Sequence, residues 1–131
     1  MGARVESTLK GFFEYITEMS ESDKRRLRSL VEMLLSHHLK IKYVGGRDIS
    51  HWKIEAREFE DTLFELIVNY SPGLKSYEID LQQVHTKLVR LRPFPGKLRK
   101  AYLRADFPEV CPFTLENVVG QRVWNELKKR R

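Results

Sequence analysis

Side chains of apolar character recur at helical spacing along most of this chain, and glycine and proline interrupt the pattern at intervals. The clearest stripe extends over three turns and consists of Leu27, Leu30, Val31, Leu34, Leu35, His38 and Leu39. Gly45 and Gly46 follow it, and paired glycines favour the left-handed conformation that ends a helix. Such a chain can bury its apolar stripes only by packing helices against one another.

The same periodicity predicts further helices before and after this stripe. The first runs from about residue 6 to residue 19, and Ser20 can cap the second helix. The third begins near Asp48 or Ser50, carries Trp52 as a core residue, and ends before Ser71-Pro72-Gly73. The fourth covers about residues 77–91.

The C-terminal part predicts one long helix from about Thr114 to Lys129, with Thr114 as its N-cap. Between the fourth helix and this one the pattern leaves two alternatives open. Residues 96–104 form either a short helix or one arm of a hairpin, whose other arm is residues 88–92. We expect one all-α domain over residues 1–131, a bundle of four or five helices.

The composition limits the class of protein. With 41% hydrophobic and 32% charged residues, the chain is typical of a globular protein. No apolar run approaches the roughly 20 residues of a membrane span, so we expect no membrane association. Cys111 is the only cysteine, which excludes an intrachain disulfide and fits a reducing cytoplasm.

The charge is distributed unevenly. Residues 1–80 contain 12 Lys and Arg and 14 Asp and Glu, for a net charge of −2. Residues 81–131 contain 12 Lys and Arg and only 4 Asp and Glu, for a net charge of +8. This asymmetry indicates a polyanion or an acidic surface as partner.

The excess of positive charge is densest between residues 81 and 105. This segment contains seven Lys and Arg, no acidic residue, and the aromatic residues Phe94 and Tyr102 among the cations. Cations neutralise phosphates and aromatic rings can stack on bases, so the segment predicts nucleic-acid contact. The alternative is a solvated face that packs against acidic helices or another subunit. No known nucleic-acid recognition motif is present. The candidate binding residues are Arg90, Arg92, Lys97, Arg99, Lys100 and Arg104.

The four histidines do not predict a metal site. His37 and His38 are adjacent and point about 100° apart on a helix, and neither a His-Glu-x-x-His motif nor a cysteine pair is present. We therefore expect neither metal nor cofactor, and we interpret His37 as a ring that hydrogen-bonds between helices. Arg57 is placed to lean inward, where it could pair with Glu14. Cys111, between two prolines, is interpreted as a packed thiol rather than a nucleophile.

Several short segments, in order, resemble the bacterial domain-of-unknown-function family twenty-nine, a group common in cyanobacteria. The segments are 14–19, 22–27, His37–Lys40, Trp52 with Arg57-Glu58, 71–74 and, best of all, Phe107–Leu115. The family's N-terminal Tyr and Trp segment and its Tyr-Arg-Asp-Ala-Arg helix have no clear counterpart here. The resemblance implies an all-helical fold and offers no catalytic residues to carry over.

These observations favour a non-enzymatic binding module that uses a basic C-terminal face for nucleic acid or an acidic protein partner. Two alternatives stay open. One is a small hydrolase or nuclease with a site around His37 and Arg57. The other is a structural homodimer that pairs its aromatic helix faces. No paired carboxylates and no base–nucleophile spacing stand out, and no catalytic residue is assigned.

Overall fold

The computed structural model describes residues 20–70, 79–91 and 106–129, and of Tyr70 and Leu91 the backbone only. Within these ranges the chain forms helices and no strand, which confirms the all-α prediction. The elements are α2 (Glu21–Leu39), a short π-helix (Lys40–Val44), α3 (Ile49–Tyr70), α4 (Leu81–Leu91), α6 (Leu115–Val119) and α7 (Gln121–Lys128). None of these helices is long and apolar enough to cross a bilayer. The helix predicted over residues 6–19 lies outside the described ranges.

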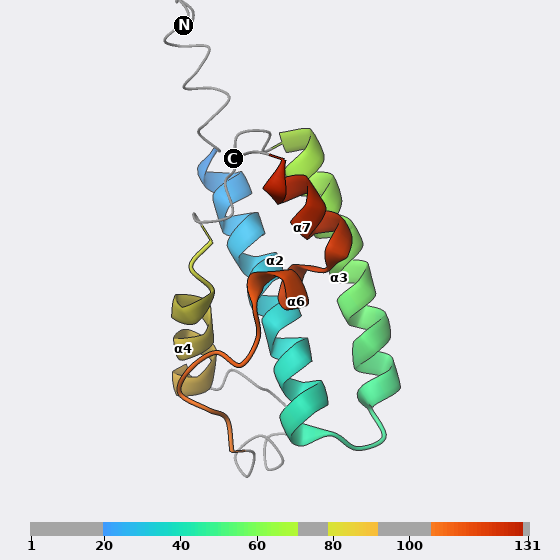
Figure 1. Ribbon diagram of the computed structural model, residues 1–131, viewed down its shortest axis with the longest axis vertical. Helices are drawn as coiled ribbons and strands as arrows, with labels where there is room; N and C mark the ends of the chain where they lie inside the picture. The colour runs from blue at the N-terminus through green and yellow to red at the C-terminus, as the bar shows by residue number, and fades with distance from the viewer. Residues whose placement is uncertain (1–19, 71–78, 92–105, 130–131) are drawn as a thin grey trace, which may run out of the picture.

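Helices α2 and α3 form an antiparallel pair that is the centre of the fold (Figure 1). The Ser20 hydroxyl accepts a hydrogen bond from the Asp23 amide at 3.1 Å, so Ser20 caps α2 as predicted. At the other end the Gly45 amide donates to the Lys40 carbonyl at 2.9 Å, which closes the π-helix. Gly45 adopts a φ of 68°, the conformation that glycine allows at low cost, and the chain then turns into α3.

The remaining helices cover two sides of this pair. Figure 1 shows α4 beside α2 on the side away from α3, while α6 lies against α2 and α7 against α3. The core lies where these helices meet, and its fully buried members include Leu34, Leu35, Leu39, Leu63, Leu66, Ile67, Val118, Val119, Val123 and Leu127. In the described helices, the apolar stripes predicted from the sequence therefore lie on the buried faces.

The single C-terminal helix predicted from Thr114 to Lys129 is wrong, because the structure has two helices, α6 and α7, separated by Gly120. Gly120 adopts a φ of 88°, and a Cβ at this position would overlap the Glu60 carboxylate of α3. The chain therefore bends where its backbone comes close to α3. The predicted cap is confirmed, since the Thr114 hydroxyl accepts from the Asn117 amide at 3.2 Å and the Asn117 side chain returns a bond at 3.1 Å.

The hairpin alternative is also wrong for residues 88–91, which form the last turn of α4. Leu88 is buried against the core, as expected for a residue on the apolar side of a helix. The other proposed arm, residues 96–104, lies outside the described ranges, as does the predicted start of the helix at residue 77.

The turn before α6 is held by side chains of α4. The His85 ring donates through Nε2 to the Pro108 carbonyl at 2.7 Å. The Gln82 amide donates to the Glu109 carbonyl at 3.0 Å and accepts from the Cys111 amide at 2.7 Å. Two side chains of α4 therefore supply the backbone hydrogen bonds that this turn, which has no regular structure, needs.

Candidate functional site

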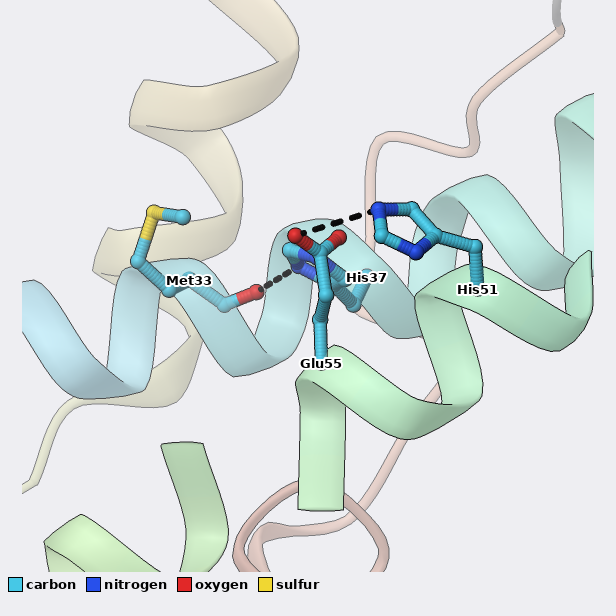
Figure 2. A network of polar contacts seen from close by, with 4 residues as sticks. All are labelled: Met33, His37, His51 and Glu55. Carbon is cyan, nitrogen blue, oxygen red and sulfur yellow. Dashed lines mark hydrogen bonds and ion pairs between the residues drawn. The ribbon is translucent and has the colours of Figure 1, made fainter. Parts of the chain in front are cut away.

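A buried polar network joins α2 to α3 and is centred on His37 (Figure 2). Seven residues separate His37 from Leu30, so its ring lies on the apolar stripe of α2 and is only 2% exposed. Nδ1 donates to the Met33 carbonyl at 2.7 Å, and Nε2 lies 3.0 Å from Glu55 Oε1 of α3. The predicted hydrogen bond of His37 between helices is confirmed.

The hydrogen-bond partners of the His37 ring engage both of its nitrogens. A carbonyl oxygen can only accept, so Nδ1 carries a hydrogen. Nε2 faces the Glu55 carboxyl group, which can take part in the contact either as acceptor or as donor. In either arrangement both ring nitrogens are occupied. The ring is therefore built to join two helices, and neither nitrogen is available to exchange a proton with a substrate.

Glu55 connects this buried contact to the surface. Its second oxygen lies 3.4 Å from Nε2 of His51, one turn earlier on α3 and largely exposed (Figure 2). The hydrogen bond with His37 lowers the pKa of the Glu55 carboxyl below its ordinary 4.5, and the charges of His51, His37 and Lys40 act in the same direction. The network therefore favours an ionised Glu55.

Lys40 and Trp52 close the same end of the helix pair. The Lys40 ammonium lies 5.3 Å from the centre of the Trp52 ring, within the range of a cation–π contact. Burial lowers the pKa of the Lys40 ammonium, and the Glu55 charge opposes this shift. Trp52 is 3% exposed, which confirms it as a buried residue of α3.

The structure brings His37 together with Glu55 and not with Arg57. Arg57 is exposed and makes no ion pair with a described residue, so the prediction that it leans inward is wrong. It lies two residues after Glu55, which turns it about 200° around α3. Glu14, its predicted partner, is outside the described ranges. No group of three His, Cys, Asp or Glu side chains in the described ranges is arranged to hold a metal ion.

Cys111 is packed against the turn that carries it. Its thiol donates to the Phe113 carbonyl at 3.5 Å, and burial raises the pKa of the thiol above its ordinary 9.0. A thiol in this state is a poor nucleophile, because the thiolate is the reactive form. Next to it, the Phe113 ring packs on His38 with centroids 5.5 Å apart. These contacts support packing rather than catalysis.

Aromatic side chains of the described helices, which a homodimer could use, also contribute to the packing of the fold. In the described ranges Phe59, Phe64, Phe113 and Trp124 pack at least partly against the core. The large apolar side chains that are exposed there are Met33 on α2, Ile54 and Val68 on α3, and Val110 in the turn before α6.

Of the six predicted binding residues, only Arg90 lies in the described ranges. It is exposed near the end of α4 and makes no ion pair with a described residue. Arg92, Lys97, Arg99, Lys100 and Arg104 lie outside and stay predictions. Lys87, one turn before Arg90, lies 2.9 Å from the Glu32 carboxylate of α2. One cation of the basic segment is therefore paired within the fold.

Glu55 and Gln82 are among the residues of these contacts that the sequence did not single out. Glu55 follows His51 by four residues, and this spacing was the available signal for a polar pair on one side of α3. Gln82 gave no signal, because its partners lie 27 and 29 residues further along the chain.

Comparison with known proteins places most of the chain in one family. A family model described as Domain of unknown function DUF29 matches residues 8–124. This match confirms the family resemblance seen in the sequence. No curated protein and no solved structure matches the chain significantly.

Proposed function

The chain belongs to the DUF29 family, and we propose that it is a non-enzymatic helical module that binds nucleic acid through α4 and the basic segment after it. The observation that carries this proposal is the exposed side of α4. Its exposed side chains are polar or basic and include no carboxylate: Gln82, Gln83, Thr86, Lys87 and Arg90. Such a surface suits phosphates, which attract cations and are repelled by carboxylates.

The sequence after α4 extends this charge. Residues 92–104 contain five Lys and Arg and no acidic residue. In contrast, both nitrogens of His37, the histidine that would have supported catalysis, are occupied by structural contacts. Binding therefore explains the exposed charge without requiring a reactive group.

Salt-dependent binding tests this function. Fluorescence anisotropy should detect binding to labelled duplex DNA, single-stranded DNA or RNA at low salt. The affinity should fall with a log–log slope of about −0.9 per phosphate contact on duplex DNA. Replacing Arg99 and Lys100 together with Ala should flatten that slope by roughly 1.8, whatever the sequence of the DNA.

The control is Lys53→Ala with Arg57→Ala, which removes the same charge from exposed positions of α3. We expect this pair to change the slope little. Absence of binding at low salt would overturn the proposal. So would equal effects of the two double variants, because binding would then depend on net charge alone.

A further inference from the structure

The side of α2 next to α4 carries two arginines, Arg25 and Arg28, which lie outside the basic segment of residues 81–105. With 100° per residue, Arg25 and Arg28 lie within about 40° of Glu32 around the axis of α2. Glu32 marks the direction of α4, because it pairs with Lys87 of that helix. Both arginines are exposed, and neither makes an ion pair with a described residue.

The matching side of α4 is basic as well. Gln83 and Arg90 lie within about 60° of Lys87 around the axis of α4. The turn at residues 107–111 is held on a different side of α4, by Gln82 and His85. Because α2 and α4 run in the same direction (Figure 1), the arginines of α2 precede the Glu32–Lys87 pair and Arg90 follows it.

We infer that Arg25, Arg28, Lys87 and Arg90 form one nucleic-acid-binding surface, the α2–α4 face. This inference rests on the proposed function and adds α2 to its contact surface. A rise of 1.5 Å per residue gives the row a length of about 15 Å. Duplex DNA carries one charge per about 1.7 Å of its axis, so a row of this length meets several phosphates.

The chemistry of the face favours nucleic acid over a protein partner. Interfaces between proteins usually bury an apolar or aromatic core, whereas those with nucleic acid are more polar and more positive. The α2–α4 face contains no exposed apolar residue. The nearest exposed one on α2, Met33, lies about 100° from Glu32, on the side where Arg26 also lies.

Glu32 is the carboxylate within this row, and it limits how strongly the face attracts phosphate. Its contact with Lys87 is partly solvated, since the Lys87 side chain is 52% exposed and that of Glu32 is 21% exposed. Glu21 lies on the same stripe near the start of α2, 3.7 Å from the Lys24 ammonium. Removing the charge of Glu32 should free Lys87 for a phosphate.

Arg28 and Arg26 provide a matched pair for the test. Both are exposed arginines of α2, but two residues turn them about 160° apart, so only Arg28 faces α4. In anisotropy titrations on duplex DNA, Arg28→Ala should flatten the log–log salt slope by about 0.9. It should weaken binding on the order of 8-fold at 0.1 M salt, the factor for one lost contact. Arg26→Ala should leave slope and affinity close to those of the unaltered chain.

Glu32→Gln should have the opposite effect. The freed Lys87 should steepen the slope by about 0.9 and tighten binding. The control is Glu65→Gln, which removes the same charge from an exposed position of α3. Melting temperatures of all four variants show whether each is folded, and we expect them to stay close to that of the unaltered chain.

The outcomes separate this inference from the proposed function. If the unaltered chain ignores DNA and RNA at low salt, both fail. If it binds and the Arg99 and Lys100 double variant flattens the slope, while Arg28→Ala and Arg26→Ala behave alike, only the α2–α4 face is overturned. A gain in affinity with Glu32→Gln and not with Glu65→Gln supports it.

Discussion

Helix α2 contacts a neighbour on each side through a polar pair that contains a glutamate, and the two pairs differ in their surroundings. Toward α3, His37 meets Glu55 at 3.0 Å with its ring buried. Toward α4, Glu32 meets Lys87 at 2.9 Å with the ammonium half exposed. The two pairs have nearly equal distances between their atoms but differ in how much water reaches them. Water screens the second pair and can replace either partner, whereas a lost partner in the first leaves a buried polar group unsatisfied.

This difference indicates that the α3 side of α2 is a structural contact and that its α4 side is a solvent-exposed surface. On the α3 side, ring, carbonyl and carboxylate satisfy one another, and Trp52 and Lys40 close the end of the helix pair. On the α4 side the cations outnumber their carboxylate partners. A charge that the fold does not neutralise is the one available to a ligand.

The largest expected effect tests the α3 side. Trp52→Ala should destabilise the fold by about 3–5 kcal/mol, because it removes a large buried ring and leaves a cavity. Denaturant unfolding followed by circular dichroism measures the loss. The control is Ile54→Ala, two residues along the same helix but 61% exposed, which should cost less than about 0.5 kcal/mol. An unchanged midpoint for Trp52→Ala would reject its role in the core.

The next effect concerns the buried pair itself. His37→Ala leaves the Met33 carbonyl and the inner oxygen of Glu55 without their partner, and should cost about 1–3 kcal/mol. His51→Ala removes the exposed ring on the other oxygen of Glu55 and should cost less than about 0.5 kcal/mol. Equal losses would show that burial does not distinguish the two histidines, and the comparison would fail.

The sequence predicted helices α2, α3 and α4, their buried faces and the caps of α2 and α6. The periodic stripes predicted the buried faces of α2, α3 and α4, and the Thr114 cap and the burial of Trp52 are confirmed. Local patterns determine these features, because a stripe or a cap depends on residues within a turn or two of one another.

The features that the sequence did not predict depend on contacts between distant segments. The apolar stripe continues through Gly120, so the break between α6 and α7 becomes evident only from the approach of Glu60. For His37, local pattern indicated a partner on another helix but not which carboxylate. Arg57 and Glu55 are only two residues apart but point to nearly opposite sides of α3, so the packing of α3 on α2 decides which of them faces α2.

A smaller effect should appear on acidification. The pKa of Glu55 is lowered in the folded state by its hydrogen bond with His37, so the unfolded chain binds this proton more readily. The resulting stability is fully present above the ordinary pKa of 4.5 and is lost as the pH falls through the lowered value. The melting temperature should therefore decrease as the pH is lowered below about 4.5. Glu55→Gln should flatten this part of the plot of melting temperature against pH.

A second titrating group, His38, affects stability in a different pH range and can be distinguished from Glu55. Burial lowers the pKa of His38 below its ordinary 6.5, so its protonation favours unfolding and stability should already decline as the pH falls below 6.5. His38→Gln should remove this earlier decline and leave that of Glu55 in place. A Glu55→Gln profile that matches the unaltered chain below pH 4.5 would contradict the role of the His37–Glu55 contact.

The smallest effect belongs to the exposed pair, and it determines whether Lys87 is available to a ligand. A double-mutant cycle with Glu32→Gln and Lys87→Met should give a coupling energy of about 0.2–1 kcal/mol, because solvent screens an exposed ion pair. The coupling should shrink further as salt rises from 0.05 to about 0.5 M, since added ions screen the remaining attraction. A coupling above about 2 kcal/mol that resists salt would place this pair with the buried contact on the other side of α2. Lys87 would then be held by the fold, and the α2–α4 face would lose the cation at its centre.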